Sequence, residues 1–392
     1  ILQFYYSSTK VLNEVYNVVD KLGLIILAGG LSTRMGQPKA LLPWINGESL
    51  ISHALRKGLD ADVQDILISI GDDEQLGLAI QTHIIDTLSN DEKNKVSIVR
   101  DSVGRCGPLG GLYSTLAVGT SSAYAVMAVD MPFMEMDLYY DWLYQVDHND
   151  WNAIVPYSES GKSEPMAGIY RPYIASLIQS ILVGENVSLH HALDVIGHVE
   201  SIDATDFSWE LSNINRFEDY QWARALAENE FRRVPLISVV ASKRKTGKTT
   251  VVTRLVCELQ NIGLSVGVVK SDKHGFQMDH EGTDTDLAYK AGADAVAIAG
   301  PTETAIRIRM KEQSNLYEIS QFMPVDIVIL ETRSQGIAPI IEVTQEGYTE
   351  ELISDPMDRV ATIEISKLDQ DVPELVRHIQ EMMRSLNGRR YC

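Results

Sequence analysis

The chain has 392 residues, more than one ordinary hydrophobic core accommodates, so two domains are expected. Hydrophobic residues make up 45% and charged residues 22%, as in globular proteins, and the net charge of −20 argues against a general nucleic-acid binder. Cys106, Cys257 and Cys392 have neither CxxC nor zinc-ligand spacing and are expected to be inert thiols in a reducing cytoplasm. No apolar run reaches the roughly 18 residues of a membrane span.

Residues 1–21 lack the basic and apolar regions of a signal peptide, and they are expected to form a helical extension. Over residues 22–227, apolar runs alternate with helical patterns. The expected strands are GLIILAG, DILISIG, AYAVMAVD, NAIVPYSES and PMAGIYRP, and the expected helices include SLISHALRKGL and LYSTLAV. Because strands of parallel sheets are continuously apolar, this alternation predicts an α/β sheet with helices on both faces.

The second half repeats the alternation after a charged helical stretch that ends at Pro235. A linker is expected over residues 228–235, followed by a second α/β domain over residues 236–392. Its expected strands are LISVVAS, SVGVVKSD, DAVAIAG, TAIRIRM, VDIVILET and RVATIEI. A helix, TTVVTRLVCELQNIG, is expected to end near Gly263.

The first strand leads into LAGGLSTRMGQPK, a loop with small residues and two cations. Gly29 and Gly30 allow backbone amides to approach a ligand closely. Exposed N–H groups form an anion-binding nest, and Arg34 and Lys39 supply full charges to a triphosphate. The loop therefore predicts a nucleotide site at the carboxyl edge of the sheet.

The pattern L-A-G-G-x-S-x-R-M-G-x-x-K resembles the signature of nucleotidyltransferases that transfer a nucleoside monophosphate from a triphosphate. Three further segments are similar to those of the molybdenum cofactor guanylyltransferases: VRDSVGRCGPLGGL, AVDMPF and LSNINRFEDY. The resemblance covers residues 22–227. It implies a Rossmann-like nucleotidyltransferase fold of the nucleotide-diphospho-sugar transferase type.

The resemblance also implies which residues bind the substrates. The GTP-binding positions would be Leu27, Ala28, Gly29, Gly30, Lys39, Ser69, Asp101 and Asp130, with Ser69 where the family usually has asparagine. Catalysis would rest on Arg34, Lys39 and Asp130, with Asp130 also holding Mg²⁺. Asn213 and Asn215, from the late motif, would lie on the molybdopterin side.

In the implied reaction, the terminal phosphate of molybdopterin attacks the α-phosphorus of GTP and expels pyrophosphate. A phosphate monoester is already an anionic nucleophile, so no Ser-His-Asp arrangement is needed. The barrier is mainly repulsion and misalignment between anions, which a metal ion and cationic side chains relieve.

The second glycine loop, ASKRKTGKTT, carries the G-K-T of a P-loop at Gly247, Lys248 and Thr249, with Ser242 in place of the first glycine. The expected nucleotide-binding residues are Thr246, Gly247, Lys248, Thr249 and Thr250. Glu331 ends the apolar strand VDIVILE, as a Walker B acid would, and would hold Mg²⁺ together with Thr249.

Residues 235–345 resemble the GTP-binding adaptor that accompanies the guanylyltransferase, most clearly in VGVVKSDKHGFQMDHEGTDTDLAYKAGADAVAI. This resemblance implies a P-loop NTPase-like fold. The adaptor family follows its acid with G-F-K, whereas this chain has Thr332, Arg333 and Ser334. Nucleotide binding is therefore expected more than vigorous hydrolysis, with at most a weak GTPase activity.

Together these features predict a bifunctional protein of molybdenum cofactor biosynthesis in the cytoplasm, with Mg²⁺ as cofactor and GTP and molybdopterin as substrates. Expected protein partners are other enzymes of this biosynthesis and recipient molybdoenzymes or their chaperones, and a homo-oligomer is an open alternative. No nucleic acid or membrane is expected as a partner. The rival functions are a molybdopterin cytidylyltransferase, a sugar-phosphate nucleotidyltransferase, and a P-loop regulatory GTPase with an inactive N-terminal domain.

Overall fold

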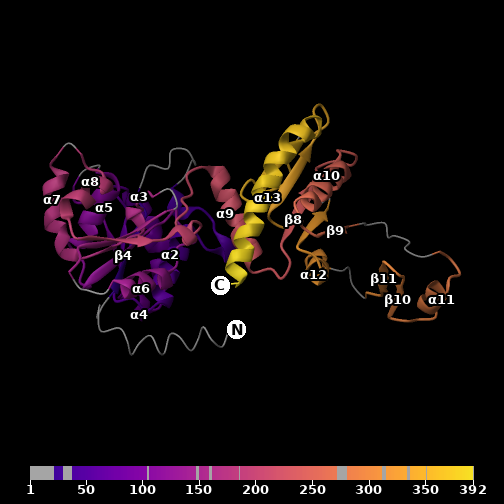
Figure 1. Cartoon of the computed structure of the whole chain (residues 1–392), viewed down its shortest axis with the longest axis horizontal. Coiled ribbons are helices and arrows are strands. Elements are labelled where there is room, and N and C mark those ends of the chain that lie inside the picture. The colour runs from indigo at the N-terminus through magenta and orange to yellow at the C-terminus, as the bar shows by residue number, and fades with distance from the viewer. Residues whose placement is uncertain are drawn as a thin grey trace. The chain divides into compact units, whose positions relative to one another are not determined.

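The computed structural model describes residues 22–29, 38–103, 106–146, 150–158, 161–184, 186–271, 280–310, 315–332, 336–349 and 351–391. The chain divides into two compact units between Asp219 and Tyr220, and both units are α/β (Figure 1). The expected fold class is thereby confirmed. The N-terminal extension lies outside the described residues.

The first unit is built on a seven-stranded sheet with strand order β3-β2-β1-β4-β6-β5-β7. The strands are β1 Leu22–Leu27, β2 Ile66–Ser69, β3 Val96–Val99, β4 Ala123–Ala128, β5 Ala153–Tyr157, β6 Ile169–Tyr170 and β7 Val199–Asp203. The expected segment PMAGIYRP gives only the short strand β6, which runs antiparallel to β4 and β5. All other pairings in this sheet are parallel, so their carboxyl ends share one edge.

Helices cover both faces of this sheet, as the sequence predicts: α5, α7 and α8 lie on one side of β4 and α2, α4 and α6 on the other (Figure 1). The helices of the unit are α2 Leu50–Asp60, α3 Glu74–His83, α4 Asn90–Lys93, α5 Gly107–Leu116, α6 Met136–Gln145, α7 Ala175–Leu182 and α8 Leu189–Ile196. Short 3-10 turns include η1 Lys39–Leu41, η2 Ile45–Gly47, η3 Ile85–Thr87, η4 Pro165–Ala167, η5 Pro172–Ile174 and η6 Thr205–Phe207.

The core of the first unit forms where apolar helix faces meet continuously buried strands. β1 and β4 have every residue buried. Leu109, Leu112 and Leu116, spaced three and four residues apart on α5, pack in one cluster with Ile25 and Val126 of the sheet. This packing fixes the N-terminus of α5 beside the carboxyl ends of β1 and β2.

The second unit contains a five-stranded parallel sheet with strand order β14-β13-β8-β12-β9. Its strands are β8 Leu236–Val240, β9 Val266–Lys270, β12 Ile327–Glu331, β13 Ile340–Thr344 and β14 Arg359–Glu364. The helices are α9 Phe217–Glu230 (which spans the division between the units), α10 Lys248–Asn261, α11 Asp284–Lys290, α12 Leu316–Phe322 and α13 Leu368–Tyr391, with the turn η7 Ile365–Lys367. The predicted strand-loop-helix of a P-loop is present as β8 and α10.

Strand β13 is absent from the sequence prediction, because Glu342 interrupts its apolar run. The Glu342 side chain is fully buried. Its carboxylate accepts hydrogen bonds from the backbone N–H groups of Ile353 (2.7 Å) and Ser354 (3.0 Å), and from Arg359 Nη1 (3.3 Å). A buried charge is tolerated only when it is paired and hydrogen-bonded, and here these donors supply that environment.

The expected strands DAVAIAG and TAIRIRM do form, but they do not join the parallel sheet. β10 Ala295–Ala299 and β11 Thr304–Ile308 pair with each other as an antiparallel hairpin. Ile298, Ile306 and Ile308 are each nearly 60% exposed there. Their apolar runs predicted strands correctly, but they do not indicate which sheet the strands enter.

The end of α9 is attached to β8 through a buried asparagine. Asn229 is fully buried, and its side chain donates to Ala225 O (3.0 Å) and accepts from Leu236 N (2.9 Å). Residues 228–230, the start of the expected linker, thus belong to α9. No helix among the described residues is both long enough and apolar enough to span a bilayer.

Candidate functional site

The loop that leaves β1 is held against the end of β2. The N–H groups of Ala28 and Gly29 both donate to Ser69 O, at 2.8 and 3.0 Å. A Cβ on Gly29 would lie 2.6 Å from the backbone nitrogen of Gly71, so only glycine permits this approach. Gly30 and Arg34, which the sequence places in the same loop, lie outside the described residues.

Lys39 and Asp130, which the sequence analysis assigns to one site, come together at this edge. Lys39 Nζ lies 2.9 Å from Asp130 Oδ2 and donates to Ile214 O at 2.7 Å. The Ile214 N–H in turn donates to Asp130 O at 2.8 Å. About a fifth of each side chain of the ion pair is exposed, 21% for Lys39 and 18% for Asp130. The pair is therefore accessible to a ligand from one side.

Asp101 and Ser69 form a second polar group at the same edge. Ser69 Oγ donates to Asp101 Oδ1 at 3.3 Å. A Cβ on Gly111 would lie 2.5 Å from Ser69 Oγ, which explains the glycine on this face of α5. Burial raises the pKa of Asp101, and the nearby Asp72 carboxylate adds to this effect, while the bond from Ser69 opposes it. A ligand that donates hydrogen bonds would stabilise the ionised form of Asp101.

The two asparagines of the late motif differ in their surroundings. Asn213 Oδ1 is buried and has no hydrogen-bond partner among the described residues. It immediately precedes Ile214, whose backbone contacts both Lys39 and Asp130. Asn215 is exposed, and its backbone N–H donates to Asp219 Oδ2 at 3.1 Å. Because buried acceptors are rarely left unsatisfied, Asn213 is the better candidate to receive a ligand hydrogen bond.

The donor set at this edge fits Mg²⁺. This ion commonly takes one or two protein carboxylates and completes its shell with phosphate oxygens and water. Asp130 supplies one such carboxylate on the accessible side of the ion pair. The remaining ligands would have to come from the substrate and from water.

The second unit has its polar groups at the carboxyl edge of β8. Gly247 has φ +98°, and a Cβ there would lie 2.7 Å from Ile365 Cδ1, so two independent restrictions favour glycine. Lys248 is only 7% exposed, and its Nζ lies 3.4 Å from Lys243 O, within its own loop. Thr246 Oγ1 donates to the same carbonyl at 2.8 Å. The loop thus wraps around its lysine, as a P-loop does.

Beside this loop, a hydroxyl, a carboxylate and a second lysine converge. Thr249 Oγ1 donates to Glu331 Oε1 at 3.2 Å, and Lys270 Nζ lies 3.5 Å from the same oxygen. Glu331 is 8% exposed and ends β12. A Ser/Thr hydroxyl and a strand-end carboxylate are the donors that a P-loop offers to Mg²⁺, so these residues fit that ion. Thr250, also on the first turn of α10, is exposed.

Lys270 received no role from the sequence, although it belongs to the pattern that resembles the adaptor. The signal in the sequence was that Lys270 ends an apolar run, as Glu331 does. In the structure the two strands pair in parallel, and Lys270 lies opposite Glu331. Thr332 is buried, whereas Arg333, Ser334 and His274 lie outside the described residues.

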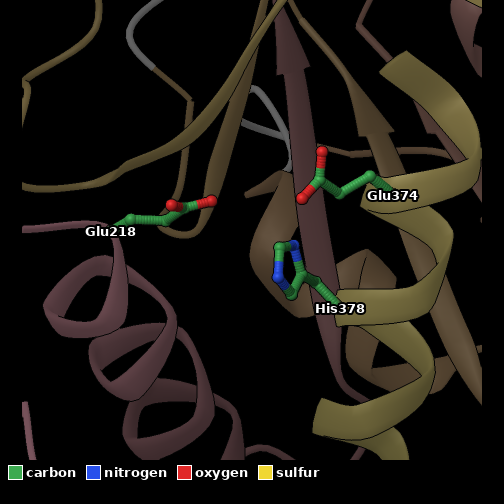
Figure 2. Close-up of side chains that lie close together, drawn as sticks. All are labelled: Glu218, Glu374 and His378. Carbon is green, nitrogen blue, oxygen red and sulfur yellow. The ribbon is translucent and has the colours of Figure 1, made fainter. Parts of the chain in front are cut away.

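Glu374 and His378 form a different polar group, one turn apart on α13, and their side chains project from the same face of that helix (Figure 2). The His378 ring lies 5.0 Å, centroid to centroid, from Trp222 of α9. Glu218, the third side chain labelled in Figure 2, precedes the division between the two units.

The two edges define the class of the protein: both units are built as α/β nucleotide-binding domains, one with a lysine–aspartate pair at the carboxyl edge of its sheet and the other with a P-loop. The family comparisons agree with this assignment. The model of the MobA-like NTP transferase domain matches residues 24–194, and that of molybdopterin guanine dinucleotide synthesis protein B matches residues 236–365. The first unit is therefore a MobA-like NTP transferase domain and the second a MobB domain, which makes the protein a nucleotidyltransferase.

Curated relatives align with about half of this chain. A "Probable molybdenum cofactor guanylyltransferase" of Bacillus cereus (strain G9842) is 27% identical over 209 residues, which is 53% of this chain and 97% of the relative. One of Bacillus anthracis (strain CDC 684 / NRRL 3495) is 26% identical over 216 residues, 54% of this chain and 100% of the relative. This chain therefore spans such proteins almost completely and continues beyond them.

Solved structures resemble each unit at lower identity. Molybdopterin-guanine dinucleotide biosynthesis protein A from Archaeoglobus fulgidus is 17% identical, with a TM-score of 0.43, and the match covers 53% of this chain and 98% of that one. A MobB protein homolog from Bacillus stearothermophilus is 17% identical, with a TM-score of 0.27, over 37% of this chain and 98% of that one.

Proposed function

We propose that the first unit transfers GMP from GTP to molybdopterin, giving molybdopterin guanine dinucleotide and pyrophosphate, and that the second unit binds GTP as an adaptor. The observation that carries the proposal is the Lys39–Asp130 ion pair, 2.9 Å long, at the same sheet edge as Asp101. The names of the relatives of the first unit support guanine as the base.

In the proposed reaction, a terminal phosphate oxygen of molybdopterin attacks the α-phosphorus of GTP, and the bond from that phosphorus to the bridging oxygen breaks. Pyrophosphate leaves with the bonding electrons. Because the attacking phosphate monoester is already an anion, no proton has to be removed from the nucleophile. Lys39 would place its ammonium against the triphosphate, and Asp130 would hold Mg²⁺. When bound, this ion supplies charge neutralisation for the triphosphate. Arg34 is proposed as a further cation at the triphosphate.

Selection of the base is assigned to Asp101 and Ser69. Guanine offers N1–H and N2–H donors, and a carboxylate is an acceptor-only group when ionised. Ser69 Oγ already donates to Asp101 Oδ1, so the hydroxyl orients the carboxylate and leaves its second oxygen for the base. Leu27, Ala28, Gly29 and Gly30 are proposed to line the nucleotide, and Asn213 and Asn215 the molybdopterin side.

The second unit is proposed to hold the phosphates of a second GTP with Thr246 to Thr250, and Mg²⁺ with Thr249 and Glu331. Hydrolysis is proposed to be weak. Covalent linkage raises the effective concentration of the adaptor beside the enzyme, which would favour transfer of the finished cofactor to recipient enzymes or their chaperones. These partners, like cytoplasmic location, are part of the proposal.

The experiment is a turnover assay with the full chain, molybdopterin and Mg²⁺, given GTP, CTP, ATP or UTP in turn and monitored by pyrophosphate release. We expect pyrophosphate only with GTP, in amounts equal to the dinucleotide formed. Turnover with CTP in place of GTP would identify a cytidylyltransferase. A parallel assay replaces molybdopterin with a sugar phosphate, and pyrophosphate release only in that assay would identify a sugar-phosphate enzyme. GTP binding without transfer to either acceptor would favour a regulatory GTPase.

A further inference from the structure

A lysine outside the proposed site is attached to the backbone segment that follows Asp130. Lys57 lies in the last turn of α2. Its Nζ donates to Pro132 O at 2.6 Å and to Met134 O at 2.7 Å, and it lies 2.8 Å from Glu135 Oε1. Only 9% of the Lys57 side chain is exposed. One largely buried ammonium thus contacts three acceptors within residues 132–135, namely two backbone carbonyls and one carboxylate.

A histidine on the same face of α2 reaches the same segment. His53 lies one helical turn before Lys57, and its Nε2 is 3.2 Å from Pro132 O. Its Nδ1 is 3.2 Å from Glu48 Oε2, which orients the ring. Pro132 O therefore lies between two polar side chains of one helix.

The side chains of this segment are also packed against other parts of the first unit. Phe133 makes edge contacts with Trp44 and with Trp209, at centroid distances of 5.9 and 6.2 Å. Met134 is fully buried. The segment begins two residues after Asp130, so its position bears on the position of the carboxylate that pairs with Lys39.

Burying an ammonium group to satisfy carbonyl groups has a high desolvation free energy. Taking an ammonium out of water is costly unless every donor finds an acceptor, and a neutral side chain would satisfy a single carbonyl at less cost. A three-donor cation, in contrast, fixes several acceptors relative to one another. Among the described residues, no backbone N–H group donates to Pro132 O or Met134 O, so these carbonyls are available to Lys57. The nearby backbone hydrogen bonds run from Met131 N to Ala128 O and from Met134 N to Met131 O.

We propose that Lys57 is a positioning residue for nucleotidyl transfer: by fixing the carbonyls of residues 132–134 it holds the Asp130 carboxylate in place at the sheet edge and thereby sets the affinity of the first site for the divalent ion. The inference rests on the proposed role of Asp130 as the metal-binding carboxylate. Lys57 does not contact substrate, and it acts only through the backbone that carries Asp130.

The test compares Lys57→Met, which keeps the length of the side chain and removes its charge, with Lys57→Arg in the full chain. We expect the Mg²⁺ concentration for half-maximal pyrophosphate release to rise about tenfold in Lys57→Met. At saturating Mg²⁺, kcat should fall less than threefold and the KM for GTP should stay within twofold. Lys57→Arg, which retains donors and charge, should recover most of the Mg²⁺ affinity.

Two controls separate this role from simpler ones. Lys95→Met also removes one positive charge, but from a lysine that pairs with Asp62 ahead of β3, and it should leave the Mg²⁺ dependence unchanged. Glu135→Gln removes the acid partner, which is 55% exposed, and retains both carbonyl bonds. It should also behave like the wild type, because the carbonyls and not the ion pair position the segment.

A binding measurement makes the test independent of turnover. Mn²⁺ binding in the presence of GTP, followed by electron paramagnetic resonance, should weaken about tenfold on Lys57→Met, with both chains carrying Lys248→Ala to silence the second site. Unchanged Mn²⁺ affinity together with a lowered Tm would overturn the proposal and leave Lys57 a purely structural residue. If Lys57→Met does not fold, unchanged Mn²⁺ affinity and full activity in Lys57→Ala would overturn it as well. Absence of transfer by the wild type, with Mn²⁺ still weakened by Lys57→Met, would instead reject the proposed function alone.

Discussion

The two nucleotide-type edges use the same kinds of side chain in opposite arrangements. In the first unit, lysine and carboxylate pair directly, Lys39 with Asp130, and come from segments 91 residues apart. In the second, Lys248 lies against the carbonyl of Lys243 in its own loop, while Glu331 is bonded to Thr249 and a different lysine, Lys270. The lysine of the first edge is therefore placed by tertiary structure and the P-loop lysine by local chain geometry, although Glu331 also reaches the second loop from 82 residues away.

This difference has a consequence for robustness. A site assembled from distant segments depends on every element that positions them, including the contact of α2 with residues 132–134. A P-loop depends chiefly on its own backbone conformation and on the strand and helix that flank it. Substitutions far from the substrate should therefore affect the first edge more than the second.

The largest expected effect is that of Asp130→Asn. The amide keeps the shape of the side chain but loses the charge that pairs with Lys39 and holds the metal, so pyrophosphate release should fall by about 10³-fold. GTP binding by the second unit should persist, as measured by titration with a fluorescent GTP analogue. Wild-type turnover by this variant would remove Asp130 from the mechanism and with it the contrast between the edges.

The reciprocal substitution, Lys248→Ala, should weaken GTP binding at the second unit by about 100-fold, because the ammonium that contacts the β and γ oxygens is lost. Binding is best measured in chains that also carry Asp130→Asn, where the first site contributes little. Pyrophosphate release by the single variant should stay within about twofold of wild type. A parallel loss of transfer would mean that the two edges are coupled.

A third substitution, Gly29→Ala, tests the tightness of the first edge. The added Cβ would lie 2.6 Å from Gly71 N and 2.9 Å from Ile70 C, both backbone atoms that cannot rotate away. We expect a loss of about 1–3 kcal/mol in the free energy of unfolding of the first unit, measured by urea denaturation. Gly388→Ala, in α13 where a Cβ meets open space, should instead be neutral or stabilising. Equal stability of both variants would refute the close approach.

A smaller effect is expected at the second edge from Lys270→Met. Lys270 is 56% exposed, so its pairing with Glu331 is weak, and its removal frees the carboxylate for Mg²⁺. Mg²⁺ should bind the second unit about two- to fivefold more tightly in the absence of nucleotide, as measured by calorimetric titration. A tenfold loss of GTP affinity would show instead that Lys270 contacts a phosphate.

The smallest expected effect concerns pH and Asp101. Because burial raises the pKa of Asp101, the ionised carboxylate destabilises the folded state above its folded pKa and costs nothing below the unfolded pKa of about 3.9. Asp101→Asn should therefore raise Tm slightly near neutral pH, and the difference should vanish below about pH 4. The same variant should lose discrimination for GTP. An equal gain in Tm at every pH would rule out this electrostatic origin.

Much of this architecture follows from the sequence, for reasons visible in particular residues. The runs that became β1, β4, β8 and β12 are continuously apolar because both faces of these strands are buried. Strand β13 was missed because Glu342 interrupts its apolar run. This acid is nevertheless buried, because donors from other parts of the chain satisfy its carboxylate. The separate β10–β11 hairpin was missed because apolar runs carry no information about strand partners.

The candidate sites divide in the same way. Lys39, Asp101 and Asp130 each follow a strand or a glycine loop, so a common edge was predictable and the structure brings Lys39 to Asp130. The carbonyl of Ile214 and the ammonium of Lys57 were not predictable, because a backbone acceptor has no sequence signature and a helical lysine normally indicates a solvated surface. The roles of the predicted residues stay predictions until the variants above are measured.

The buried Glu342 also constrains how the sequence of this domain can drift. Its carboxylate is satisfied jointly by Ile353, Ser354 and Arg359, from the segment that leads into β14. Loss of the acid removes the carboxylate partner of a guanidinium that is only 15% exposed, and loss of the guanidinium removes the cationic donor to a fully buried acid, so each change is destabilising alone. We therefore expect homologous chains either to retain the residues at positions 342, 354 and 359 or to substitute them together.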